Sequence, residues 1–115
     1  FVSTLSACSA IDGTDAVLEQ PAAATPPIYI KNGYNLTKWV AERILQHARD
    51  QGVWVNIYRP GNIAFDSRTG VCQPQKNRLM LMPKGSLQLG QVPAFDINFD
   101  LMPVDFLARF IGFHA

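Results

Sequence analysis

The feature that most constrains this chain is a tyrosine and a lysine four residues apart at the start of a predicted helix. Tyr34 and Lys38 are followed by helix-forming and regularly spaced apolar residues, which predict a helix from about Tyr34 to Asp50 that stops at Gly52. Side chains at positions i and i+4 of a helix lie on one face. A nearby ammonium group favours a phenolate over a phenol, which suits a tyrosine to proton transfer at a reacting oxygen. The spacing alone also fits a surface lysine beside a packing tyrosine.

Two short strands are expected to flank this helix. Residues 1–7 form an apolar run that leads into hydroxyl-bearing residues, and residues 53–58 form a second apolar run before an Arg-Pro-Gly turn at residues 59–61. Strands joined through a helix are parallel, and their crossover is right-handed. Ligands bind at the carboxyl ends of such strands. We therefore expect Thr4, Tyr34 and the turn to converge at one edge of a parallel sheet.

The predicted helix has an apolar face and a charged face. Apolar residues at helical spacing are expected to be buried, and the charged residues between them are expected to face water. The buried stripe is predicted to contain Trp39, Val40, Ile44, Leu45 and Ala48, and the exposed face Glu42, Arg43, Arg49 and Asp50.

The remaining segments give weaker structural signals. Residues 12–27 contain three prolines and predict a loop. The apolar, Met-containing run at residues 79–90 is more typical of a core than of a binding site. Residues 95–102 alternate in part and predict a short strand. Pro103 then starts a closing helix, in which the macrodipole favours Asp105 near the N-terminus, and we expect a structural role for this carboxylate.

Composition excludes several functional classes. A length of 115 residues allows one domain at most, and 48% hydrophobic with 17% charged residues indicates a folded globular chain. A net charge of +1 provides no electrostatic attraction to nucleic acid or to an anionic membrane. No apolar run approaches the roughly 18 residues of a membrane span, and no signal peptide is visible.

The cysteines and histidines indicate a cytoplasmic protein without a metal. Cys8 and Cys72 are too few for a disulfide framework and are read as structural thiols of a reducing compartment. His47 and His114 are isolated, and no His, Cys or carboxylate cluster has the spacing of metal ligands.

The order of motifs resembles that of a known family. A strand, a Tyr-x-x-x-Lys helix, a second strand and Arg-Pro-Gly follow one another as in the extended short-chain dehydrogenase/reductases. Within that group the chain resembles the thioester reductase domains that end some non-ribosomal peptide and polyketide synthetases, relatives of carboxylic acid and fatty acyl-CoA reductases. The resemblance covers nearly the whole chain, and its most specific marks are residues 1–4, 34–42, 59–63, 66–70 and 103–106.

The resemblance implies a partial α/β fold. Residues 1–64 would form the second half of a Rossmann-like, doubly wound parallel sheet, and residues 65–115 part of a helical substrate-side subdomain with a closing helix. A reductase of this kind needs a Gly-rich loop whose backbone amides hold the cofactor pyrophosphate. The eight glycines of this chain form no such loop. We therefore expect a C-terminal fragment of a reductase domain that lacks the N-terminal dinucleotide-binding half and is inactive in isolation.

The same resemblance implies a reaction and its residues. It assigns a catalytic triad in which Thr4 orients the thioester carbonyl, Tyr34 supplies the proton, and Lys38 supports Tyr34 and holds the nicotinamide ribose. Ser3 would point to the opposite side of an alternating strand. The substrate would be an acyl or peptidyl thioester on the phosphopantetheine arm of a carrier protein, released as aldehyde or alcohol. The cofactor is expected to be NADPH, with contacts carried over to Tyr34, Lys38, Pro60 and Asn62.

Two other interpretations remain open at the level of sequence. Tyr-x-x-x-Lys fits equally an extended reductase or epimerase that acts on a nucleotide sugar, a steroid or a flavonoid. The residues 66–70 and 87–90 favour the thioester reductase. The third interpretation is a non-catalytic fragment without a cofactor site. An uncovered edge of the predicted sheet would favour self-association.

Overall fold

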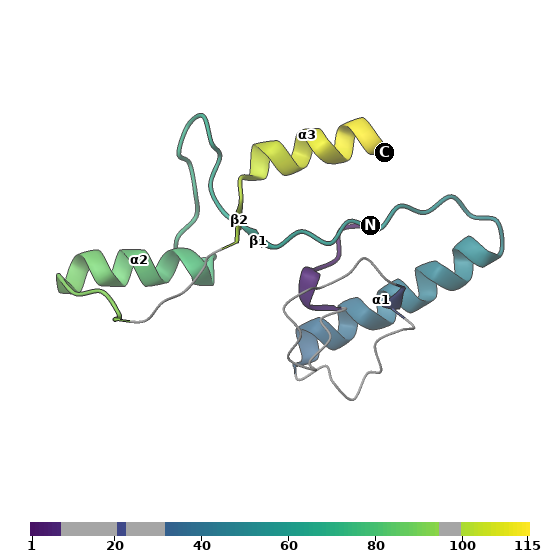
Figure 1. Cartoon of the computed structure of the whole chain (residues 1–115), viewed down its shortest axis with the longest axis horizontal. Coiled ribbons are helices and arrows are strands. Elements are labelled where there is room, and N and C mark those ends of the chain that lie inside the picture. Colours follow the sequence, from purple (N-terminus) through teal and green to yellow (C-terminus); the bar gives the residue numbers. More distant parts are fainter. Residues whose placement is uncertain (8–20, 23–31, 95–99) are drawn as a thin grey trace. The chain divides into compact units, whose positions relative to one another are not determined.

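The computed structural model describes residues 1–7, 21–22, 32–94 and 100–115, with Arg78 described by its backbone alone. These residues belong to two compact units, Phe1–Pro60 and Gly61–Ala115. Most of the loop predicted at residues 12–27, and residues 95–99 of the last predicted strand, lie outside the described part. The elements in chain order are η1 (Leu5–Ala7), α1 (Gly33–Asp50), β1 (Asn62–Ile63), α2 (Arg78–Leu89), β2 (Leu101–Met102) and α3 (Val104–His114) (Figure 1).

Helix α1 has the bounds that the sequence predicts. It begins after Asn32, whose side-chain oxygen accepts a hydrogen bond of 2.8 Å from the Asn35 amide and caps the helix. It ends at Asp50, and Gly52 follows with a φ of 89°, a conformation that glycine adopts without a steric penalty. Local signals therefore fix both ends of the helix that carries Tyr34 and Lys38.

The first unit contains the expected parallel pairing. The Tyr58 amide donates to the Phe1 carbonyl at 2.9 Å, the Ser3 amide to the Tyr58 carbonyl at 2.7 Å, and the Leu5 amide to the Pro60 carbonyl at 3.2 Å. These bonds form a short parallel ladder between the two segments, in which Val2 and Tyr58 are the paired residues. Pro60 has no amide hydrogen and cannot continue the exchange.

Both strands of this unit are shorter than predicted. Residues 53–57 form no regular strand, because residues 1–5 pair with the end of that run and residues 53–55 extend beyond them. Leu5–Ala7 turns into the 3-10 helix η1, whose first hydrogen bond joins the Ala7 amide to the Thr4 carbonyl at 3.1 Å. The predicted strand at residues 1–7 therefore ends near Thr4, where η1 packs against α1 (Figure 1).

The faces of α1 differ from the prediction. Trp39 packs against the buried Ala7 and Ala22, and its indole nitrogen donates to the Ala22 carbonyl at 2.9 Å. Val40 and Ile44, for which the sequence predicts burial, are 42% and 63% exposed. The prediction for Glu42 is wrong in the opposite sense, because its carboxylate is buried and bonded to partners from other segments of the unit. Arg43, Arg49 and Asp50 face solvent as expected.

The second unit is built around a short parallel pair, β1 and β2. Asn62 pairs with Leu101 and Ile63 with Met102. The cap of α2 is joined to this pair, since the Asn77 side chain accepts from the Leu79 amide at 3.1 Å and donates to the Ile63 carbonyl at 2.8 Å. A left-handed Gly90 ends α2, and α3 follows Pro103 as predicted.

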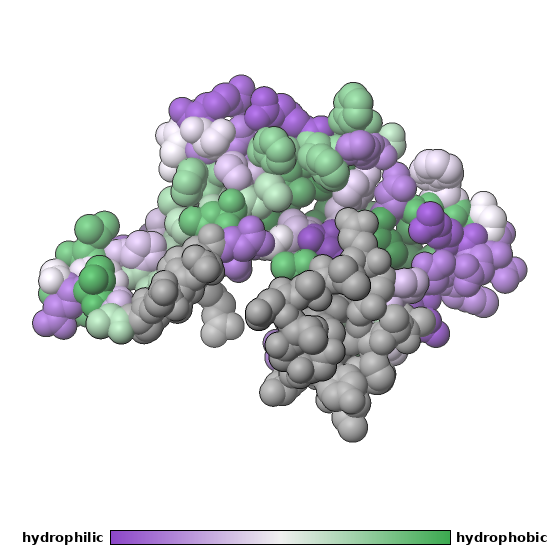
Figure 2. Space-filling model, in the orientation of Figure 1, coloured by the Kyte–Doolittle hydropathy of each residue, from purple (hydrophilic) through white to green (hydrophobic). Residues whose placement is uncertain are grey.

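Large apolar side chains remain at the surface of the described residues. Among the residues that the structure describes, the buried apolar side chains include Ala7, Ala22 and Leu107. Trp54, Leu87 and Phe113 are each more than four-fifths exposed. Figure 2 shows apolar residues along the visible face of the molecule. The described residues therefore enclose only a small apolar core.

Candidate active site

Tyr34 and Lys38 lie together on the first two turns of α1. The Lys38 ammonium nitrogen is 5.9 Å from the centre of the Tyr34 ring and 5.0 Å from the centre of the Phe1 ring. The same nitrogen donates a hydrogen bond of 2.9 Å to the Val2 carbonyl. Tyr34 is 62% exposed, so that its ring is accessible to a ligand. The lysine therefore joins the tyrosine to the strand segment that carries Thr4.

Thr4 and Pro60 lie at the carboxyl ends of the two paired segments. Thr4 is half-buried and stands at the point where the first segment turns into η1. Pro60 is buried, and its carbonyl accepts the Leu5 amide, the next residue after Thr4. Four of the five residues predicted for the site, namely Thr4, Tyr34, Lys38 and Pro60, thus belong to one unit.

Asn62 belongs to the second unit, where it pairs with Leu101 in the two-stranded sheet and is exposed. Its neighbour Gly61 lies close to Asp100, since a Cβ atom added to Gly61 would overlap the Asp100 carboxylate. A side chain at Gly61 would therefore require Asp100 to move.

A buried ion pair that the sequence did not reveal lies beside the predicted triad. The Glu42 carboxylate is 1% exposed and the Arg59 side chain 19% exposed, and an Arg59 terminal nitrogen is 2.6 Å from Glu42 Oε2. Arg59 Nε also donates to both carboxylate oxygens, at 3.0 and 3.1 Å. The hydroxyl of the buried Ser3 donates to Glu42 Oε1. The Ser3 side chain therefore points toward α1.

One sequence signal could have indicated this ion pair. Glu42 follows Lys38 by four residues and Tyr34 by eight, so the three share the face of α1 that lies toward the paired segments. A carboxylate on that face must be paired if it is buried. Arg59 at the end of the second segment is the cation that meets it.

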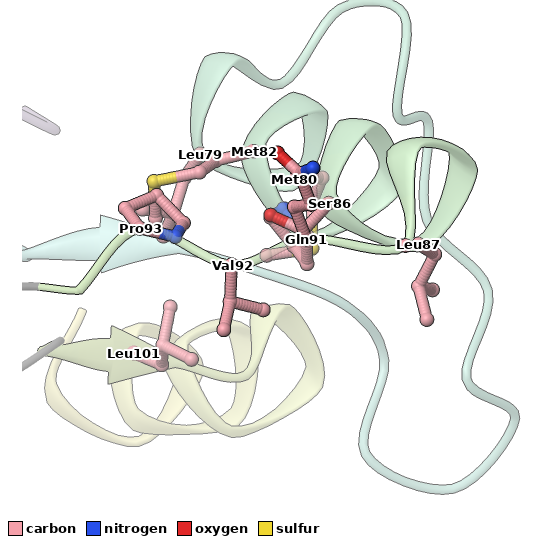
Figure 3. Close-up of a pocket in the computed structure, with 11 residues that line it drawn as sticks. Leu79, Met80, Met82, Ser86, Leu87, Gln91, Val92, Pro93 and Leu101 are labelled. Carbon is pink, nitrogen blue, oxygen red and sulfur yellow. The ribbon is translucent and has the colours of Figure 1, made fainter.

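The second unit contains an apolar cavity on α2 (Figure 3). Its volume is about 700 Å³, and residues of α2, the following loop and β2 surround it. Apolar groups form most of its lining, including Leu79, Met80, Met82, Val92 and Leu101. A cavity of this size and character suits an apolar small molecule.

Two carboxylates of the second unit are held by backbone amides. The Thr69 amide, followed by the Arg68 amide, holds the pKa of the Asp66 carboxyl below its ordinary value of 3.8. The Ser67 amide donates to Asp105 Oδ1 at 2.8 Å, and the Ser67 hydroxyl donates to Asp105 Oδ2 at 2.9 Å. These bonds hold the pKa of the Asp105 carboxyl below the same ordinary value. Asp105 thereby joins the turn at residues 66–70 to the start of α3, which is the structural role that the sequence predicts.

The described residues contain neither a cluster of metal ligands nor a helix that could span a membrane. Within the ranges 1–7, 21–22, 32–94 and 100–115, no three His, Cys, Asp or Glu side chains gather as metal ligands would. In the same ranges no helix combines the length and the apolar character needed to cross a membrane.

Comparison with known proteins identifies the family. A family model described as "Male sterility protein", an NAD-binding family, matches residues 1–111. The chain belongs to this family. Membership of an NAD-binding family implies a nicotinamide cofactor.

Individual relatives of the chain include a synthase subunit and a reductase that are much longer than this chain. The chain is 39% identical over 112 residues to a linear gramicidin synthase subunit from Brevibacillus parabrevis, covering 95% of this chain and 2% of that protein. It is 31% identical over 100 residues to L-2-aminoadipate reductase of Saccharomyces cerevisiae, covering 87% and 7%.

A solved structure supports the same assignment. The crystal structure of the terminal R domain from the myxalamid PKS-NRPS biosynthetic pathway matches with a TM-score of 0.84 and 33% identity, over 96% of this chain and 28% of that one. These likenesses confirm the resemblance inferred from the motifs and the partial, Rossmann-like α/β fold class. The chain spans a small part of the length of each of these relatives.

Proposed function

We propose that this chain is part of an NADPH-dependent reductase that releases an acyl or peptidyl thioester from the phosphopantetheine arm of a carrier protein as aldehyde or alcohol. The observation that carries the proposal is the Lys38 ammonium, which contacts the Tyr34 ring and the carbonyl of Val2, two residues before Thr4. The names of the relatives, which include a gramicidin synthase, an aminoadipate reductase and a terminal R domain, support this substrate class.

The donors of the site fit a nicotinamide cofactor and a carbonyl substrate. A lysine ammonium has three N–H donors, and the bond to Val2 uses one of them. The remaining donors suit the hydroxyls of the nicotinamide ribose. We assign Tyr34 and Lys38 to ribose binding, and Pro60 and Asn62 to the cofactor surface. The bound cofactor would supply hydride to the carbonyl carbon.

Each residue of the triad has a distinct role in this proposal. The Thr4 hydroxyl orients the thioester carbonyl by donating to its oxygen. The Tyr34 hydroxyl donates its proton to that oxygen as negative charge develops there. The Lys38 charge stabilises the phenolate that remains. Loss of the thiol from the reduced carbon then frees the aldehyde from the carrier arm.

The cavity on α2 supports a substrate-side role for residues 65–115. Its apolar lining suits the hydrocarbon part of an acyl group better than a nucleotide sugar, which carries hydroxyls and phosphates. This observation favours the thioester reductase over an epimerase that would share the Tyr-x-x-x-Lys helix.

Tyr34→Phe tests the proposal because it removes one oxygen and keeps the ring. In the complete protein, NADPH consumption with an acyl-phosphopantetheine thioester should fall by about 10²- to 10⁴-fold in kcat, the usual contribution of a general acid. Unchanged turnover in Tyr34→Phe would refute the assignment. Comparison of NADPH with NADH in the unaltered protein tests the cofactor.

The matched control is Tyr58→Phe, which makes the same chemical change at another tyrosine of the first unit. The bonds of Tyr58 to Phe1 and Ser3 come from its backbone, and they do not depend on the hydroxyl. Turnover of Tyr58→Phe should therefore stay close to that of the unaltered protein. An equal loss in both variants would point to a general disturbance of the unit and not to a proton donor at Tyr34.

A further inference from the structure

The geometry points to Glu42 as a positioning residue that, with Arg59 and Ser3, holds the segments of the triad in register. This inference rests on the proposed function for its kinetic part. None of the three side chains is assigned to the reaction itself. Each is bonded to another within the first unit, and each lies next to a residue of the proposed site in sequence or along α1.

The contacts of Glu42 join all the segments that supply the site. Its own position is one helical turn after Lys38, on the same face of α1. Its Oε1 accepts a hydrogen bond from the hydroxyl of Ser3, the residue directly before Thr4. Both of its oxygens accept hydrogen bonds from the side chain of Arg59, the residue directly before Pro60. One carboxylate thereby fixes the helix of Tyr34 and Lys38 against both paired segments.

The backbone contacts alone leave this junction weakly determined. Pro60 cannot donate to the first segment, so after Ser3 the ladder continues through the bond from the Leu5 amide to the Pro60 carbonyl. Thr4 lies between those two bonds. Side chains must therefore supply the constraint that a longer ladder would give, and a bidentate arginine–carboxylate pair fixes both distance and orientation.

The buried Glu42–Arg59 pair is not needed for stability alone, because the desolvation of both charges offsets much of their attraction. A buried ion pair can often be replaced by apolar residues of similar volume without loss of stability, whereas removal of one partner leaves an unpaired charge. The double variant E42M/R59M therefore separates the two roles. It removes both charges together and keeps the volume, but it cannot bond Ser3.

The kinetic test uses the complete protein, with NADPH and an acyl-phosphopantetheine thioester. For E42M/R59M we expect a near-normal melting temperature and a kcat about 10²-fold lower, the effect of a misplacement of about 1 Å. Because positioning acts in the transition state, kcat and kcat/KM should fall together with little change in KM. The control Asp50→Asn removes the charge of an exposed carboxylate on the same helix, where Asp50 Oδ1 accepts a 3.0 Å hydrogen bond from Gln46, and it should leave kcat unchanged.

The second readout does not depend on activity. Hydrogen exchange at the Leu5 amide reports the bond to Pro60, and it should become faster in E42M/R59M than in Asp50→Asn. Ser3→Ala serves where the double variant does not fold, since it keeps the ion pair and removes only the hydroxyl. It should accelerate Leu5 exchange and lower kcat by a smaller factor.

The outcomes separate this inference from the proposed function. Normal kcat and normal Leu5 exchange in a folded variant would overturn the positioning role. A lower kcat with unchanged Leu5 exchange would also overturn it, because Glu42 would then act in the reaction itself. A complete protein that reduces no thioester would refute the proposed function, and Leu5 exchange would still decide the role of Glu42.

Discussion

The two units each use a carboxylate on a helix to hold a neighbouring segment, but the two carboxylates have different partners. In the first unit Glu42 is buried and pairs with Arg59, whose side chain is 19% exposed. In the second unit Asp105 is bonded to the Ser67 amide and hydroxyl, and its ion partners Arg68 and Arg109 are 77% and 71% exposed, at 3.9 and 3.5 Å. The first arrangement depends on charge pairing and the second on backbone amides.

The two carboxylates therefore depend on different partners, Arg59 in the first unit and the Ser67 amide in the second. Removal of a cation from a buried pair leaves an uncompensated charge. Removal of a solvent-exposed cation changes little, since water and salt already screen it. Arg59 and Arg109 each pair with a carboxylate on a helix, but their replacement should therefore have very different effects.

Arg59→Ala is expected to have the largest effect on stability. The buried Glu42 carboxylate would lose its bidentate partner, which we expect to cost about 3–5 kcal/mol in the free energy of opening of the first unit. Hydrogen exchange at the Ser3 and Tyr58 amides, which form the ladder, measures this free energy.

The matched control for Arg59→Ala is Arg109→Ala in the second unit. It removes an exposed partner of Asp105 and should leave the exchange of the α3 amides unchanged. Equal effects of the two substitutions would contradict the distinction between the units.

The helix caps offer a smaller and more closely matched comparison. Asn77 caps α2 through the Leu79 and Met80 amides and also donates to Ile63, whereas Asn32 caps α1 through the Asn35 amide. Replacement by alanine should cost about 1 kcal/mol for Asn32 and about 2 kcal/mol for Asn77, which loses an additional hydrogen bond.

The amides that follow each cap measure this difference. The Leu36 amide donates to the Asn32 carbonyl at 3.0 Å, and the Leu81 amide donates to the Asn77 carbonyl at 3.2 Å. Exchange should accelerate more at Leu81 in Asn77→Ala than at Leu36 in Asn32→Ala. The reverse order would show that the bond to Ile63 adds nothing to the cap.

The sequence predicted the features of this fold that depend on neighbours in the chain. The bounds of α1 follow from helix-forming residues and Gly52, and the parallel pairing follows from the order of strand, helix and strand. The length of the second strand could not be predicted in this way, because it depends on how far residues 1–5 extend beside it.

The buried state of Glu42 depends on more distant residues. Arg59 is 17 positions away and Ser3 is 39 positions away, so the helical spacing that places Glu42 on the face of Lys38 does not reveal which groups pair with it. The contact of Tyr34 with Lys38 is local and was predictable, whereas the bond from Lys38 to Val2 spans 36 positions. The proposed catalytic pair was therefore easier to predict than the residues that hold it in place.

The smallest expected effect is a pH dependence confined to the second unit. Backbone amides lower the pKa of Asp105 and Asp66 in the folded state below 3.8. A carboxyl with a lowered pKa stabilises the fold at pH values above its unfolded pKa, and this contribution disappears as the pH falls through the folded value. The bonds between the turn at residues 66–70 and α3 should therefore persist at neutral pH and weaken only below about pH 3.8.

Titration of the Ser67 amide by NMR measures this transition at the residue that contacts Asp105. In Asp105→Asn the acid transition of Ser67 should be absent, while the Thr69 amide, which is bonded to Asp66, should still titrate. A Ser67 transition that persisted in this variant would assign the pH dependence to another group. If Ser67 titrated near neutral pH in the unaltered protein, the backbone amides would not be what stabilises the Asp105 carboxylate, and the contrast with the charge-paired Glu42 would not hold.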